Sequence, residues 1–110
     1  MEHKVILIVA NEPIAEKDTE FKEWYLGEYL PLMVKFDGIK QATCYEQTPG
    51  NMDSTRYLAI YEFDDQESLS AFPSSPEFAA ALKNQEAKWK DDIIDRQWWA
   101  SYEVIKTWGK

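Results

Sequence analysis

The stretch EFKEWYLGEYLP (Glu20–Pro31) sets the period of the first half of the chain. Its large apolar side chains recur at three- and four-residue steps: Phe21, Trp24, Tyr25, Tyr29 and, just beyond it, Leu32. This spacing predicts a helix that begins near Ala15 and ends at Gly38. We expect Pro31 to kink this helix near Leu30, because proline lacks an N–H group and clashes with the preceding turn.

Segments rich in β-branched and aromatic residues surround this helix and predict four strands. They are Lys4–Ala10, Ile39–Thr48, Thr55–Phe63 and Asp95–Trp108. Before the last strand, the acids of DDQESLSAF (64–72) can cap a short helix, and PSSP (73–76) interrupts it. A longer helix then runs from Pro76 to about Asp92, with Phe78, Ala81, Leu82, Ala87 and Trp89 expected to be buried.

The order β-α-β-β-α-β predicts an α+β, ferredoxin-like fold in which a four-stranded antiparallel sheet carries two helices on one face. Two local expectations accompany it. Asp18 or Thr19 should cap the first helix, and Gly38 should end it in a left-handed conformation. With 110 residues and no linker or repeat, we expect residues 1–110 to form one domain.

The charge of the chain excludes several classes of partner. Its formal net charge of −8 disfavours nucleic acid and anionic membrane surfaces, which both require basic patches. The N-terminal apolar run is too short to span a membrane and lacks the features of a signal peptide, so a cytoplasmic location is the expectation.

Few residues in the sequence suit metal or nucleophilic chemistry. His3 is the single histidine and Cys44 the single cysteine, so no structural zinc set can be assembled and no metal is expected. We interpret His3 as part of a frayed start and Cys44 as a small buried hydrophobe, against the alternatives of a ligand and a nucleophile. No cofactor motif is present.

The strands indicate a partner for the sheet. Two helices cover one face, yet the first, third and fourth predicted strands are apolar or aromatic on both faces. The uncovered face would exceed the apolar patch of about 300–600 Å² that is usual for monomers. A second copy of the same sheet, related by a twofold axis, is the simplest cover, although a different partner is not excluded.

Four segments together are similar to the dimeric α+β barrel superfamily, and most closely to its EthD-like branch. They are NEP (11–13), EFKEWYLGEYLP (20–31), DGIKQATCYEQ (37–47) and YLAIYEFDDQESLSAF (57–72). That branch carries a pattern resembling E-F-N-x-W-Y-x-x-E-H-L-P. The chain departs from it at Tyr29, which stands in place of the histidine, and at Asp37-Gly38, which replaces a Pro-Gly step.

The resemblance implies a homodimer whose sheets face each other, with a cavity in each subunit between the sheet and the first helix. Relatives in the superfamily include cofactor-free monooxygenases, polyketide cyclases, isomerases, haem-degrading enzymes and proteins with no established activity. Histidine is well suited to proton transfer near neutral pH, whereas tyrosine, with an ordinary pKa near 10, is a better hydrogen-bond donor than base.

The candidate site follows from the helix stripe and the resemblance together. Tyr29 is the predicted catalytic group, which would orient or protonate a substrate, with Glu28 or Glu62 as the base. The predicted ligand-binding residues are Phe21, Trp24, Tyr25, Tyr45, Tyr57, Tyr61, Trp98 and Tyr102, with Gln41, Thr43 or Arg56 as polar points. The sequence leaves open which face of the sheet lines the cavity, and whether the helix stripe is only core.

Two functions remain in competition. The first is a homodimer that binds a small apolar or aromatic molecule and that acts, if it is an enzyme, as a cofactor-free monooxygenase, cyclase or isomerase on a phenolic or polyketide-like compound. The alternative is a catalytically silent dimeric binding or structural protein.

Overall fold

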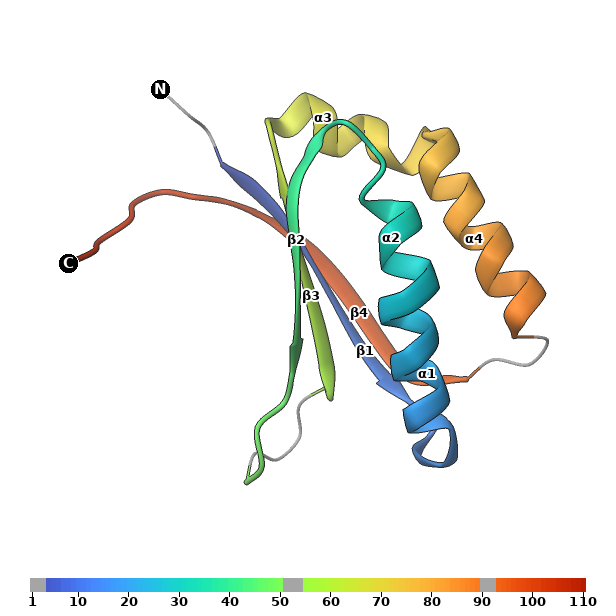
Figure 1. The fold of residues 1–110 in the computed structure, drawn as a ribbon. Helices are drawn as coiled ribbons and strands as arrows, with labels where there is room; N and C mark the ends of the chain where they lie inside the picture. The colour runs from blue at the N-terminus through green and yellow to red at the C-terminus, as the bar shows by residue number, and fades with distance from the viewer. Residues whose placement is uncertain (1–3, 51–54, 90–92) are drawn as a thin grey trace.

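A computed structural model describes residues 4–50, 55–89 and 93–110 of the chain. Within these residues, one antiparallel sheet contains β1 (Val5–Pro13), β2 (Ile39–Glu46), β3 (Tyr57–Phe63) and β4 (Ile94–Glu103). The strand order is β2-β3-β1-β4. The helical segments all lie on one side of the sheet (Figure 1). The predicted ferredoxin-like α+β fold is confirmed.

The first helical segment changes its winding ahead of Pro31. It consists of η1 (Ala15–Lys17), α1 (Asp18–Trp24), η2 (Tyr25–Tyr29) and α2 (Leu30–Met33). η2 is a π-helical turn, in which the Leu30 N–H donates to the Tyr25 carbonyl five residues earlier. Pro31 has no N–H to continue the α-helical ladder, and a wider turn relieves the clash of its ring with the preceding carbonyl. The predicted kink is therefore a π turn.

The second helical segment follows the predicted breaks. It contains α3 (Gln66–Ala71), η3 (Phe72–Ser74) and α4 (Pro76–Lys88). The Asp65 side chain caps α3 by accepting from the Ser68 N–H at 2.8 Å. Ser75 caps α4 by accepting from the Phe78 N–H at 3.1 Å, with Pro76 at the first position of the helix. The predicted interruption at residues 73–76 and the restart of the helix at Pro76 are confirmed.

Two expectations for the first helical segment are wrong. No side chain caps α1, and the Asp18 carboxylate instead accepts a hydrogen bond from the Tyr57 hydroxyl at 2.8 Å. Gly38 has no positive φ, whereas Gly50 does, at 95°. Gly38 is needed for space, because a Cβ there would lie 2.7 Å from the Phe36 ring and 2.8 Å from the Ser68 Cβ.

The ends and the burial of two later elements also differ from the prediction. α4 ends at Lys88, where Trp89 is already extended. Leu82 and Ala87 are exposed, because only a narrow stripe of α4 faces the core. β4 ends at Glu103, and no strand continues through residues 104–110.

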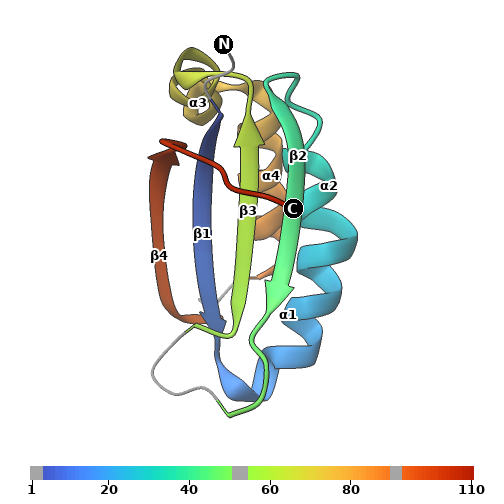
Figure 2. The same cartoon turned by 90° about the vertical axis from the view of Figure 1, so that its left-hand side faces the viewer.

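The register of the sheet assigns each strand residue to a face. On β1, Leu7, Val9 and Asn11 face the helices together with their β3 partners Tyr61, Ala59 and Tyr57. The other face, which we call the open face, has no helix of the described chain over it (Figure 2). Its three rows across β2, β3, β1 and β4 are Tyr45-Leu58-Ala10-Trp98, Thr43-Ile60-Ile8-Ala100 and Gln41-Glu62-Ile6-Tyr102.

In the described part of the chain, every helix is too short or too polar to cross a membrane.

Candidate functional site

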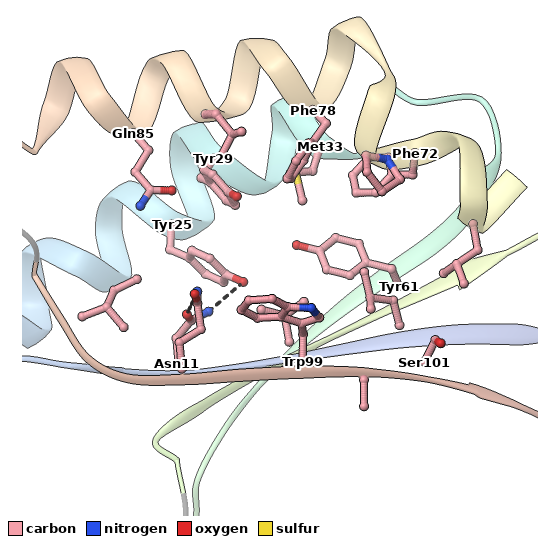
Figure 3. Close-up of a pocket in the computed structure, with 18 of the residues that line it drawn as sticks. Asn11, Tyr25, Tyr29, Met33, Tyr61, Phe72, Phe78, Gln85, Trp99 and Ser101 are labelled. Carbon is pink, nitrogen blue, oxygen red and sulfur yellow. Dashed lines mark hydrogen bonds between the residues drawn. The ribbon is translucent and has the colours of Figure 1, made fainter.

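A cavity of about 760 Å³ lies between the sheet and the helices. Its floor comes from β1, β3 and β4, its roof from η2, α2 and α4, and one end from α3 and η3 (Figure 3). Most of the lining is apolar or aromatic, as is usual for small-molecule sites. The lining residues are Leu7, Val9, Asn11, Phe21, Trp24, Tyr25, Tyr29, Met33, Tyr61, Leu69, Ser70, Phe72, Pro73, Phe78, Leu82, Gln85, Ile94, Gln97, Trp99, Ala100 and Ser101.

The cavity is open towards the edge strand β4. In Figure 2, α1, α2 and α4 lie behind β3 and β2, and none of the described helices lies behind β4. Ser101 is a small residue on the helix-facing side of β4, so it leaves space above β1. Trp99 lies on the same side and keeps 66% of its surface exposed, which places it at the mouth of the cavity.

The π turn builds the aromatic wall. Tyr25 and Tyr29 stack with ring centroids 5.5 Å apart and planes at 15°. Phe21 stacks on the other side of Tyr25 at 5.0 Å. A π turn has more residues per turn than an α-helix, so residues four apart lie nearly above one another. Tyr25 and Tyr29 therefore present neighbouring ring edges to the cavity (Figure 3).

A short hydrogen-bonded chain crosses the cavity floor. The Gln97 Nε2 donates to the Asn11 Oδ1 at 2.6 Å, and the Asn11 Nδ2 donates to the Tyr25 Oη at 3.3 Å. The Tyr61 hydroxyl is buried and has no hydrogen-bond partner. A buried hydroxyl without a partner costs about 1–3 kcal/mol, which makes Tyr61 unusual in a folded protein.

The cavity is electrically neutral. Within the part of the chain that the structure describes, none of its lining residues is an aspartate, glutamate, lysine, arginine or histidine. Burial raises the pKa of Tyr29 to about 12. Burial also raises the pKa values of Tyr25 and Tyr61 above their ordinary value. These phenols keep their protons near neutral pH and act there as hydrogen-bond donors.

The structure brings together five of the predicted site residues. Phe21, Trp24, Tyr25, Tyr29 and Tyr61 all line the cavity. Tyr57 is buried on the same face of the sheet but lies outside the lining, because its hydroxyl donates to Asp18. Which of them binds a ligand or takes part in catalysis stays a prediction.

Four predicted site residues lie on the open face instead: Tyr45, Glu62, Trp98 and Tyr102. The expectation that they line the same cavity is wrong for geometric reasons, since alternate residues of a strand point to opposite faces. Glu62 forms an ion pair with Lys4 at 3.0 Å. The polar points Gln41 and Thr43 share this face, and Arg56 lies outside the cavity beside Glu12 and Asp18.

Glu28 does not line the cavity either. Its Oε1 accepts from the Asn84 Nδ2 at 3.2 Å on the outer side of η2. Asn84 in turn accepts from the Trp24 Nε1 at 2.6 Å. Glu28 therefore contributes to a contact between η2 and α4.

Sequence reasoning missed the polar residues of the cavity floor, Asn11, Gln97 and Ser101. These residues alternate with apolar ones along β1 and β4, and only the facing of the strands distinguishes them from surface residues. The adjacent Trp98 and Trp99 point to opposite faces of the sheet, with Trp99 at the cavity and Trp98 on the open face.

The other two residues considered in the sequence for metal or nucleophilic chemistry are His3 and Cys44. His3 lies outside the described residues. Cys44 is half-buried and packs against the core, and burial raises the pKa of its thiol. A protonated thiol against apolar neighbours fits the interpretation of Cys44 as a small hydrophobe. No cluster of three metal-ligating side chains occurs among the described residues.

Comparison with solved structures defines the class of fold. An EthD family protein from Bacillus halodurans is 18% identical, with 94% of this chain and 99% of that chain covered and a TM-score of 0.69. A dimeric ferredoxin-like protein of unknown function from Thermobifida fusca is 10% identical, with 94% and 93% covered and a TM-score of 0.73. A candidate antibiotic biosynthesis monooxygenase from Nitrosomonas europaea is 13% identical, with 99% and 97% covered and a TM-score of 0.68.

The protein therefore shares its ferredoxin-like α+β fold with an EthD family protein and with a dimeric ferredoxin-like protein, which agrees with the resemblance found in the sequence. At these identities the likeness concerns the fold alone. Residues 5–97 match the family model described as Domain of unknown function (DUF4286), and the chain belongs to that family. A comparison with curated proteins finds no match.

Proposed function

We propose that this protein is a homodimer that binds a small, largely apolar aromatic molecule in the cavity between its sheet and its helices. The observation that carries the proposal is the cavity itself. It has about 760 Å³ of space, walls of aromatic side chains and a few polar groups on its floor. Packed protein cores leave few voids larger than a water molecule, and an apolar space of this size with a few polar groups is typical of small-molecule sites.

A binding function has more support than a catalytic one. Neither Glu28 nor Glu62, the two predicted bases, lines the cavity. Burial raises the pKa of Tyr29 to about 12, so its hydroxyl stays protonated near neutral pH and suits a hydrogen-bond donor better than a base. A catalytic role for Tyr29 remains a prediction. In that case Tyr29→Phe should abolish turnover in a substrate screen and leave the melting temperature nearly unchanged.

The open face supports the homodimer. On its two central strands lie the aliphatic side chains of Ile6, Ile8, Leu58 and Ile60, which are half-buried and partly open to solvent. Tyr45, Trp98 and Tyr102 are exposed along its edges. Residues 104–110 run across the same side of the sheet (Figure 2), with Ile105 98% exposed. A second copy of the sheet would remove this apolar surface from water.

The binding proposal can be tested with a neutral fluorescent aromatic probe, N-phenyl-1-naphthylamine. We expect one probe to bind per chain with an increase in fluorescence. Ser101→Trp places an indole in the open end of the cavity and should weaken binding by at least about tenfold. Ser74→Trp is the matched control, because Ser74 is exposed and does not line the cavity. Absence of binding, or equal binding by folded Ser101→Trp, would contradict the proposal.

A further inference from the structure

Two phenol hydroxyls face each other in the middle of the cavity (Figure 3). One belongs to Tyr61 on β3 and the other to Tyr25 on η2. Tyr61 has an exposed fraction of 0%, and its hydroxyl has no hydrogen-bond partner. The Tyr25 hydroxyl is a polar neighbour that interacts with it, but the two do not reach hydrogen-bonding geometry. An acceptor in the cavity between the two phenols would therefore supply the partner that Tyr61 lacks.

The hydrogen bonds on the cavity floor have a definite direction. Gln97 donates its Nε2 to the Asn11 Oδ1 at 2.6 Å, which leaves the Asn11 Nδ2 as the donor to the Tyr25 Oη at 3.3 Å. Asn11 is 1% exposed and Tyr25 3%, so their contact is shielded from water, whereas Gln97 at the other end is exposed. Because the Tyr25 oxygen already accepts a hydrogen bond, its own hydrogen is left to donate.

The cavity therefore offers hydrogen-bond donors without any charge. Burial raises the pKa values of Tyr25 and Tyr61, so both keep their hydrogens over the physiological range. None of the described lining residues carries a formal charge that could pair with an ion. A carboxylate bound here would lose its hydration without gaining a counter-charge, which is strongly unfavourable.

We infer that the hydroxyls of Tyr25 and Tyr61 form a two-donor subsite for the oxygen of a neutral aromatic carbonyl compound, such as an aryl ketone. A carbonyl oxygen has two lone pairs and accepts two hydrogen bonds, so it can satisfy both phenols at once. The aromatic wall of Phe21, Tyr25 and Tyr29 contacts the rings of the ligand. This inference rests on the proposed binding function and names the chemical class of its ligand.

The test compares three molecules built on the same tricyclic frame: 9-fluorenone, fluorene and fluorene-9-carboxylate. The first carries a carbonyl, the second a methylene group at the same place, and the third a negative charge. Titration calorimetry of the full chain should show 9-fluorenone binding about tenfold more tightly than fluorene, as two hydrogen bonds of ordinary strength imply. Fluorene-9-carboxylate should bind more weakly than either.

The variant Tyr61→Phe removes one donor and keeps the ring. It should reduce the preference for 9-fluorenone over fluorene to about threefold or less, with fluorene affinity unchanged. Tyr25→Phe removes the other donor and should reduce the preference for 9-fluorenone by a similar factor. Tyr57→Phe is the matched control, since Tyr57 lies on the same strand and face but its hydroxyl donates to Asp18 outside the cavity. Its preference should equal that of the wild type.

A vibrational readout separates a hydrogen bond from a general change in packing. The carbonyl stretching frequency of bound 9-fluorenone should be lower in the wild type than in Tyr61→Phe. Equal affinities for 9-fluorenone and fluorene, or tighter binding of the carboxylate, would overturn the carbonyl inference and leave the binding function in place. No binding of either neutral ligand would overturn the binding function as well.

Discussion

At the scale of single residues, two glycines occupy opposite surroundings, one in η2 and one in the turn before β2. Gly38 sits where a Cβ would come within 3 Å of Phe36 and Ser68. Gly27 lies in the exposed part of η2, where a Cβ would meet nothing within 4 Å. Neither has a positive φ. The space available for a side chain therefore differs sharply between the two positions.

We expect Gly38→Ala to lower the free energy of unfolding by about 1–3 kcal/mol, because the added methyl group must displace Phe36 or the start of α3. Gly27→Ala should raise it by about 0.5–1 kcal/mol, since alanine loses less backbone entropy in a helical turn. Urea unfolding monitored by circular dichroism measures both. Equal effects of the two substitutions would mean that the contacts around Gly38 do not determine its identity.

At the scale of elements, the π turn at Tyr25–Tyr29 connects a proline to the shape of the cavity. Pro31 cannot donate to the helix ladder, and the turn before it widens so that Leu30 bonds to Tyr25. The widened turn stacks Tyr25 on Tyr29, and both rings line the cavity. A residue outside the cavity lining thus sets the position of two that face the cavity.

Pro31→Ala should restore the missing donor and let the turn relax towards α-helical winding. The fold should be retained, while the near-ultraviolet circular dichroism of the stacked tyrosines changes and N-phenyl-1-naphthylamine binds more weakly. Pro76→Ala serves as the control, because Pro76 starts α4, where proline costs a helix little. If Pro31→Ala keeps the wild-type aromatic signal and probe affinity, the proline is not what shapes the turn.

The sequence predicted the elements well and their facing poorly. Changes of apolar period located the helices and strands, and Asp65, Ser75 and Pro76 marked boundaries that the structure confirms. The sequence could not predict which side of the sheet Tyr45, Trp98 and Tyr102 occupy, because β1 and β3 are apolar on both faces. Recognising Asn11 as a floor residue also required knowing which side of the sheet it faces. Long-range packing decides which side of the sheet faces the helices, and a single sequence carries no local signal for that choice.

At the scale of the whole molecule, the two faces of the sheet have different surroundings. The helix-facing side forms the core and the cavity, and the open face is the proposed dimer interface. Ile60 lies at the centre of the open face, between Thr43 of β2 and Ile8 of β1. It is half-buried in the single chain, so a polar group there remains in contact with water until a second sheet covers it.

We therefore expect Ile60→Asp to weaken dimerisation by about 100-fold or more, because a carboxylate would be buried without a partner in the interface. Sedimentation velocity at micromolar concentration should show a dimer for the wild type and a monomer for the variant. The matched control is Leu26→Asp, which adds the same charge to an exposed leucine of η2 on the helical side. Leu26→Asp should remain a dimer. A wild-type monomer, or a dimer that survives Ile60→Asp, would mean that something other than a second sheet covers the open face.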